Sequence, residues 1–265
     1  MGIPIYQVDA FTNHMFAGNP AAVCIPRRPV EADWMQSVAA EMNLSETAFV
    51  VSQDNGFSLR WFTPAVEVDL CGHATLATAH VLWETGRVPS DQPARFQTRS
   101  GELIARQATN GIELDFPAIP VPPGDAPDGM FAALGVEARF VGRPRSDILI
   151  EVDSEDTVRS LRPDIKGLSA AGVRGVIVTA RSASPDWDFV SRFFAPGAGV
   201  DEDPVTGSAH CALAPYWAEQ LGKQEMIGYQ ASKRGGVVGV RLAGDRVILS
   251  GQAVTVLHGE LCAGS

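Results

Sequence analysis

The segment RWFTP at residues 60–64 is followed by DLCGHATLATA at residues 69–79, and the chain later repeats this order. RFFAP at residues 192–196 precedes DPVTGSAHCALA at residues 203–214. The prolines that end the first segments lie 132 positions apart (196 − 64), and the glycines of the second segments lie 135 apart (207 − 72). Both spacings are about half of the 265 residues. The sequence therefore predicts two related halves.

Each half runs an aromatic strand into a turn with a glycine and then into an alanine-rich helix. Gly72-His73 forms the first turn and Gly207-Ser208 the second. A turn of this kind leaves backbone N–H groups unpaired at a helix start, where anions bind. The pair predicts one anionic substrate held between the halves, because ligand sites favour domain junctions. The alternative is that both glycines only allow a tight turn.

The composition predicts a globular cytoplasmic protein. Apolar residues make up 45% and charged residues 20% of the chain, and the net charge is −10. This acidic balance argues against nucleic-acid binding, which needs clustered Lys and Arg. No apolar run has the length of a membrane span, and residues 1–5 do not resemble a signal peptide.

The cysteines predict neither a disulfide framework nor a metal site. They show no Cys-x-x-Cys spacing, and reduced thiols are the default in a cytosol. Cys71 with His73, and His210 with Cys211, could each offer two ligands, but neither pair resembles a zinc pattern. We expect no metal. The four cysteines are Cys24, Cys71, Cys211 and Cys262.

The pattern of elements predicts an α+β fold with two pseudo-symmetric lobes, each a strongly bent mixed β-sheet around a central helix. Hairpin-length turns argue against a doubly wound parallel sheet. The proline-rich stretch 117–127 predicts a boundary between an N-terminal lobe, 1–116, and a C-terminal lobe, 117–265. The last dozen residues could finish the second lobe or pack back on the first.

The sequence also predicts an N-cap for one helix and a kink in another. Asp33 is a candidate N-cap for a helix that runs through about Met42. The second alanine-rich helix, over residues 208–221, contains Pro215, which should kink it.

At the two turns, His73 and Ser208 could point their side chains at the bound group, and His73 could also pass a proton. Three further side chains could carry chemistry. Glu46 precedes the apolar strand 48–51, where withdrawal from water would raise its pKa and suit it to carry a proton. It could equally be a capping or surface glutamate. Asp203 lies four residues before Gly207, so it is either a helix-capping group or a catalytic one. Cys71 adjoins the first turn, where a helix start lowers a thiol pKa, but it could also be a buried structural residue.

Six motifs together resemble the phenazine-biosynthesis PhzF-like family, whose members are related to diaminopimelate epimerase. They cover nearly the whole chain in the order of the family. The motifs are VDAFT at 8–12, FAGNPAAV at 16–23, NLSETAF at 43–49, RWFTP at 60–64, CGHAT at 71–75 and DPVTGSA at 203–209.

The resemblance implies an isomerase that works without a metal or organic cofactor on a small carboxylate-bearing substrate. A single glutamate, here Glu46, would move a proton between carbons. The founding reaction of the family isomerises trans-2,3-dihydro-3-hydroxyanthranilate, and members are commonly homodimers. The supporting polar groups would be His73, Asp203 and Ser208, and the substrate-binding residues Gly72, Gly207 and Asn19.

Two other functions remain open. One is an amino-acid epimerase or hydroxyproline-type dehydratase that uses Cys71, although the matching place in the second half holds Thr206 instead of a second thiol. The other is a carboxylate-binding protein without catalysis. The chain also departs from the phenazine enzymes over QASKRGG at residues 230–236, which leaves the physiological substrate open.

Overall fold

The computed structural model describes residues 2–262 and divides into two compact units. Among the described residues, unit 1 combines 2–115 with the C-terminal segment 250–262, and unit 2 holds residues 116–249. Residues 263–265 of the predicted C-terminal segment lie outside the described residues.

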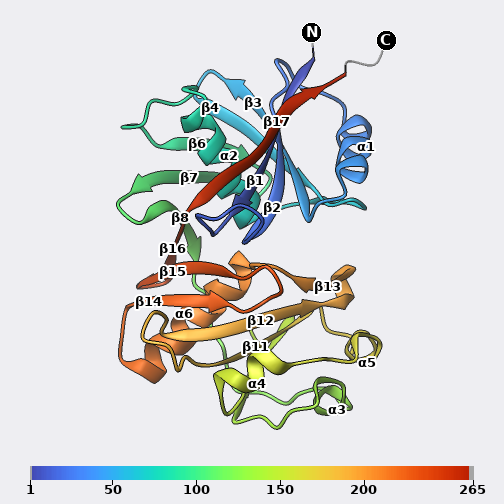
Figure 1. The fold of residues 1–265 in the computed structure, drawn as a ribbon, viewed down its shortest axis with the longest axis vertical. Helices are drawn as coiled ribbons and strands as arrows, with labels where there is room; N and C mark the ends of the chain where they lie inside the picture. Colours follow the sequence, from blue (N-terminus) through green and yellow to red (C-terminus); the bar gives the residue numbers. More distant parts are fainter. Residues whose placement is uncertain (1, 263–265) are drawn as a thin grey trace. The chain divides into compact units, whose positions relative to one another are not determined.

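Unit 1 is a mixed sheet with two helices (Figure 1). Antiparallel pairs join β17 to β1, β1 to β2, β3 to β4, β6 to β7 and β7 to β8, whereas β2–β3 and β4–β6 are parallel. Tight turns at Ser100-Gly101 and Asn110-Gly111 join β6 to β7 and β7 to β8. The elements are β1 (Ile3–Ala10), β2 (Asn19–Cys24), α1 (Ala32–Met42), β3 (Glu46–Gln53), β4 (Gly56–Phe62), β5 (Glu67–Val68), α2 (Gly72–Glu84), β6 (Ala94–Thr98), β7 (Gly101–Ala108), β8 (Gly111–Pro117) and β17 (Ala253–Leu261).

The helix α2 is the core of unit 1. Ten of its 13 residues are buried, and it contacts β1, β2, β3, β7 and β17. A helix that is apolar on all sides must be surrounded, and the alanine-rich sequence lets strands approach it closely. The predicted central helix is therefore confirmed in this unit. The predicted N-cap of α1 at Asp33 is wrong, because Glu31 is the N-cap. Asp33 lies in the first turn, where its negative charge stabilises the helix by interacting with the positive end of the helix dipole.

Unit 2 repeats this plan with more helices. The strand β12 has the neighbours of β4: it is antiparallel to β11, parallel to β14, and flanked by the short antiparallel β13. The elements are α3 (Met130–Leu134), β9 (Phe140–Gly142), β10 (Asp147–Glu151), α4 (Glu155–Ser160), α5 (Ile165–Ala170), β11 (Gly175–Arg181), β12 (Phe189–Ala195), η1 (Pro196–Ala198), β13 (Val200–Asp203), α6 (Gly207–Leu221), β14 (Glu225–Gln230), β15 (Gly236–Ala243) and β16 (Arg246–Gly251).

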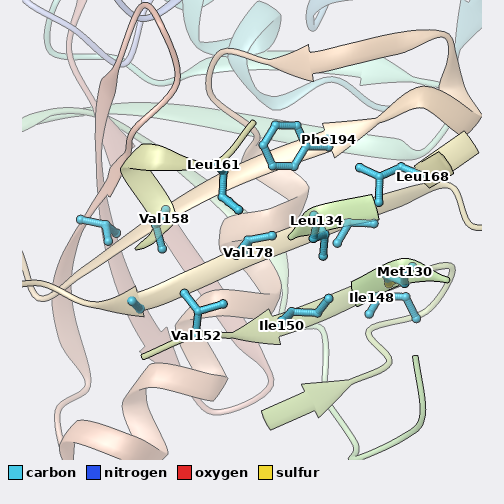
Figure 2. Close-up of a cluster of buried hydrophobic side chains, with 13 residues drawn as sticks. Met130, Leu134, Ile148, Ile150, Val152, Val158, Leu161, Leu168, Val178 and Phe194 are labelled. Atoms are coloured by element: carbon cyan, nitrogen blue, oxygen red, sulfur yellow. The ribbon is translucent and has the colours of Figure 1, made fainter. Parts of the chain in front are cut away.

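Two packing layers hold unit 2 together. Figure 2 shows one of them, in which α3, α4 and α5 cover aliphatic side chains of β10 and β11 such as Ile150 and Val178. The other is α6, which contacts β14 and β15. Within residues 2–262, no helix combines the length and the apolar character that a membrane crossing needs.

The proline inside α6 is compensated by the proline-rich stretch. Pro215 has no N–H group to donate to the carbonyl of Cys211, four residues earlier. That carbonyl instead accepts a hydrogen bond of 2.9 Å from the N–H group of Ile119. The helix consequently continues from Gly207 to Leu221.

The repeat extends to side chains. Arg60 on β4 pairs with Glu67 on β5, and Arg192 on β12 pairs with Glu202 on β13, each at 2.7 Å from Nε to Oε1. Each guanidinium also lies over the ring of the phenylalanine two positions further along its strand, at 5.2 and 4.8 Å. Each pair ties the central strand to the short strand that leads into the alanine-rich helix.

Candidate active site

Four polar side chains of unit 1 meet at one edge of its sheet. Asn19 begins β2 and Glu46 begins β3. Since these strands are parallel, with Ala21 opposite Glu46, both starts lie at the same edge. Cys71 and His73 reach this edge from the start of α2. We call Asn19, Glu46, Cys71 and His73 the Glu46 cluster.

The contacts of the Glu46 cluster form a row. The Oε2 atom of Glu46 lies 3.2 Å from Nε2 of His73. On the other side of the ring, Nδ1 of His73 lies 3.3 Å from Nδ2 of Asn19 and 3.5 Å from Sγ of Cys71. The side chain of His73 is 5% exposed and that of Glu46 is 19% exposed, so the carboxylate is the member of this pair with access to solvent.

The partners of His73 define its protonation. Burial lowers the pKa of His73 to about 3, so the ring is neutral at neutral pH. The amide of Asn19 and the thiol of Cys71 can both donate to Nδ1, which therefore acts as an acceptor. The single ring proton then lies on Nε2, which is 3.2 Å from Oε2 of Glu46 but, among the described residues, has no hydrogen-bond partner. His73 is thus a neutral ring in contact with the carboxylate.

The same row is a poor cage for a metal ion. Ligand atoms of Glu46, Cys71 and His73 all lie within 4.8 Å of one another, which is compatible with a shared ion. However, Cys71 faces Nδ1 of the ring and Glu46 faces Nε2. An imidazole binds an ion through one nitrogen, so this arrangement does not direct all three ligands to one point.

Two buried histidines should make stability depend on pH. Burial also lowers the pKa of His210 to about 4, against the opposing hydrogen bond to the Thr206 carbonyl. Both imidazoles have a reference pKa of 6.5, so below that pH the unfolded chain binds protons that the folded chain does not. The free energy of unfolding should therefore fall from about pH 6.5 toward pH 4, by up to about 1.4 kcal/mol per pH unit for each group.

Urea unfolding at several pH values measures this slope. His210→Gln should flatten the slope. Equal slopes in the wild type and His210→Gln would contradict the assignment.

In unit 2, the start of α6 is held by a second polar group. Thr206 is the N-cap of α6, and its hydroxyl donates to Oδ2 of Asp203 at 2.6 Å. Its N–H group donates to Oε1 of the buried Gln230 at 2.9 Å. Gly207 is buried, and Ser208 is exposed. We call residues 203–208 the Asp203 corner.

The two helix starts match in backbone and in one contact. Cys71 and Thr206 are N-caps with extended backbones, and, within residues 2–262, neither side chain caps its helix. The fourth residue of each helix binds the N-cap carbonyl: Thr75 Oγ1 at 2.5 Å and His210 Nδ1 at 2.8 Å. The side chains of the two N-cap residues therefore do not occupy the first-turn N–H groups, and an anion site requires these groups.

The repeat is broken at the reactive positions. Val50 lies opposite Leu59 in β3–β4, and Thr179 lies opposite Ser191 in β11–β12. A shift of 129 positions (179 − 50) thus relates β3 to β11. By this shift, Gly175 in unit 2 is the counterpart of Glu46 in unit 1. The same comparison applies to the short strands. Val68 pairs with Trp61 in unit 1, and Asp203 pairs with the matching Phe193 in unit 2, so Val68 is the counterpart of Asp203. Each half therefore carries a carboxylate that its counterpart lacks.

The predicted residues fall into two groups. Glu46, His73 and Asn19 lie together in unit 1; Asp203, Gly207 and Ser208 lie together in unit 2. The amide of Asn19 is buried and contacts His73. The hydrogen bonding of Gln230 was not predicted; the only sign of it in the sequence is that residues 230–236 depart from the phenazine enzymes.

Comparisons with known proteins identify the family. A family model described as Phenazine biosynthesis-like protein matches residues 8–259. An uncharacterized isomerase from Halalkalibacterium halodurans is 55% identical over 262 residues, which cover 98% of this chain and 99% of the relative. A PhzF-family phenazine biosynthesis protein from Enterococcus faecalis, of known crystal structure, is 41% identical with a TM-score of 0.95, covering 99% of this chain and 100% of that one.

A more distant structure shows the fold alone. A probable proline racemase from Agrobacterium radiobacter is 12% identical, with a TM-score of 0.66 over 99% of this chain and 93% of that one. The predicted fold class is confirmed: this is the α+β fold of PhzF proteins, which the diaminopimelate epimerase-like proteins share. The chain belongs to the phenazine biosynthesis-like, or PhzF, family.

Proposed function

We propose that this protein is an isomerase that moves a proton between two carbons of a small carboxylate-bearing substrate. The observation that carries the proposal is the contact of 3.2 Å between Glu46 and the neutral, buried His73. It provides a partly exposed carboxylate beside a buried ring that cannot itself take up a proton at neutral pH. The isomerase names of relatives with 55% and 49% identity support the same class.

The proposed chemistry uses the carboxylate of Glu46 as both base and acid. Beside the neutral ring of His73, the carboxylate removes a proton from a substrate carbon and returns it to another carbon on the same face. Because the position that matches Glu46 in unit 2 is Gly175, the repeat provides no second carboxylate for a two-base mechanism. N–H groups at the start of α2 would bind the negative charge of the substrate.

We assign the Asp203 corner to substrate binding and polar assistance. The N–H groups of Gly207 and Ser208 would hold a carboxylate, and Asp203 would assist proton transfer. The protein is proposed to act as a homodimer, which sedimentation of the purified chain would test.

A panel of small cyclic and amino carboxylates in heavy water tests the proposal. Trans-2,3-dihydro-3-hydroxyanthranilate belongs in the panel. We expect at least one compound to change its proton NMR spectrum to that of an isomer or to gain mass by deuterium uptake at carbon. Binding of several compounds without isomerisation or uptake would favour a carboxylate-binding protein instead.

A thiol-based epimerase or dehydratase is the second candidate, because Cys71 is the N-cap of α2 and its Sγ lies 3.5 Å from His73. Against it, the low pKa of His73 makes the ring a weak acceptor for the thiol proton. Under the leading proposal, Cys71 is only a donor to Nδ1, a role that serine can share.

Cys71→Ser should therefore keep turnover within about tenfold of the wild type, which a base in proton transfer would not allow. Iodoacetamide labelling, read by peptide mass, separates the two candidates further. Cys24 and Cys211 should stay unlabelled, since burial raises each thiol pKa to about 12. Cys262→Ser removes the exposed thiol as a control. Labelling of Cys71 that stops turnover, and that substrate prevents, would favour the thiol mechanism.

A further inference from the structure

We propose that Gln230 is a positioning residue that holds Asp203 and the start of α6 in their working geometry, an inference that rests on the function proposed above. Gln230 ends β14, and its side chain is fully buried. A buried amide is costly unless its polar atoms are paired. The partners of this amide all belong to one short segment, the Asp203 corner.

Three hydrogen bonds join the amide to that corner. Oε1 of Gln230 accepts from the N–H group of Thr206 at 2.9 Å. Nε2 of Gln230 donates to the backbone carbonyl of Asp203 at 2.7 Å and to Oγ1 of Thr206 at 3.2 Å. The partners also define the orientation of the amide, because a backbone N–H can only donate and a carbonyl can only accept.

The chain of contacts continues to the carboxylate. Oγ1 of Thr206 accepts from Gln230, and its own hydrogen is then directed to Oδ2 of Asp203 at 2.6 Å. Gln230 therefore holds Asp203 twice, through its backbone and through the hydroxyl of Thr206. It also holds the residue directly before Gly207, whose N–H group belongs to the proposed anion site.

The comparison between the halves shows that this support is specific to unit 2. Phe57 pairs with Phe96 in unit 1, and Phe189 pairs with Gly228 in unit 2, each 132 positions later. The counterpart of Gln230 is therefore Thr98. The hydroxyl of Thr98 instead donates to the carbonyl of Gly101 in its own hairpin. The long buried amide thus occurs in the half that carries Asp203.

A second contact reinforces the same turn. Oγ of Ser232 donates to the carbonyl of Pro204 at 2.8 Å and accepts from the N–H group of Gly235 at 3.1 Å. The segment 230–236 therefore supports the Asp203 corner at two successive residues, Asp203 and Pro204. A loop this closely supported can keep a reacting group within the tolerance that catalysis demands, where a displacement of about 1 Å can cost about 100-fold in rate.

Hydrogen exchange tests the structural half of this inference without a substrate. Gln230→Met keeps the side-chain length but removes all three hydrogen bonds. Exchange of the Thr206 amide, measured by NMR, should accelerate about tenfold or more, as expected for a lost buried hydrogen bond. Thr98→Val, at the matching position of unit 1, is the control and should leave that exchange unchanged. Unchanged exchange in Gln230→Met would overturn the proposal.

Kinetics test the functional half. On any compound that the wild type converts, including trans-2,3-dihydro-3-hydroxyanthranilate, Gln230→Met should lower kcat about 10- to 100-fold with a smaller change in KM. Thr206→Val should behave similarly, Thr206→Ser should recover most of the loss, and Thr98→Val should match the wild type. The double variant Gln230→Met with Thr206→Val should lose much less than the product of the two single losses, because both break one path.

The outcomes separate the two proposals. If the wild type converts a compound and Gln230→Met converts it equally well, the positioning role is wrong while the proposed function stands. If the wild type converts nothing, the proposed function fails, and the exchange measurement alone decides whether Gln230 holds the corner. Should Gln230→Met not fold, Thr206→Val against Thr206→Ser gives the same decision on the hydroxyl link.

Discussion

Replacing Glu46 with glutamine should lower turnover by about 1,000-fold or more, while the fold and the affinity for ligands change little. Glutamine has the shape of glutamate, and its side-chain oxygen can keep the contact of 3.2 Å with Nε2 of His73. It cannot accept a proton at neutral pH. The loss should therefore appear in kcat, because the missing step is the transfer itself.

The measurement is conversion of the compound found by the heavy-water panel, with thermal unfolding as the test of folding. Glu41→Gln, an exposed glutamate near the end of α1, is the matched control and should behave as the wild type. Glu46→Asp should be intermediate, since it keeps a carboxylate but withdraws it by one methylene group. Normal turnover in Glu46→Gln, with the control also normal, would contradict the proposed mechanism.

Most of the architecture could be predicted because it depends on local sequence patterns, each of which occurs twice in the chain. The segments around Gly72 and Gly207 combine an aromatic strand, a turn and an alanine-rich run, and each of these has its own residue chemistry. The second alanine-rich helix, expected over residues 208–221, runs from Gly207 to Leu221. The short helices α3, α4 and α5 were not predicted. With five or six residues each, they depend on packing against β10 and β11 more than on helix propensity.

The proposed site was predictable only as a set of residues. Sequence alone pointed to Glu46 and His73, but not to which ring nitrogen faces the carboxylate, because that depends on the parallel register of β2 and β3. The hydrogen bonds of Gln230 are even harder to predict from the sequence, since they join residues 24 and 27 positions apart in the chain. A buried amide resembles any other glutamine until the neighbouring strand is known.

Arg192→Met should destabilise the protein by about 3–5 kcal/mol, whereas Arg60→Met, at the matching position of unit 1, should cost about 1 kcal/mol. Arg192 is 9% exposed, and Glu202 is its ion-pair partner. Its Nη1 atom also donates to the carbonyl of Leu161 at 2.8 Å, just after α4 ends. Methionine preserves most of the apolar stem, so the loss reports mainly on the polar contacts left without a partner.

The unit 1 pair is better protected against the same change. Arg60 is 29% exposed, and the carboxylate of Glu67 has a second guanidinium, that of Arg99, at 2.7 Å. The hydrogen bond with Arg60 lowers the pKa of Glu67, with Arg99 adding to the effect. After Arg60→Met, Glu67 therefore keeps a cation and partial access to water.

Urea unfolding of the two variants measures the difference, and their common place in the repeat makes each the control for the other. Equal losses would mean that burial of the guanidinium does not decide its contribution. The expected inequality has a functional consequence, because the Arg192 pair joins β12 to β13, and β13 ends at Asp203. Even if Arg192→Met folds, it should lower turnover more than Arg60→Met does, since a loosened β13 no longer presents Asp203 to the hydroxyl of Thr206 at 2.6 Å.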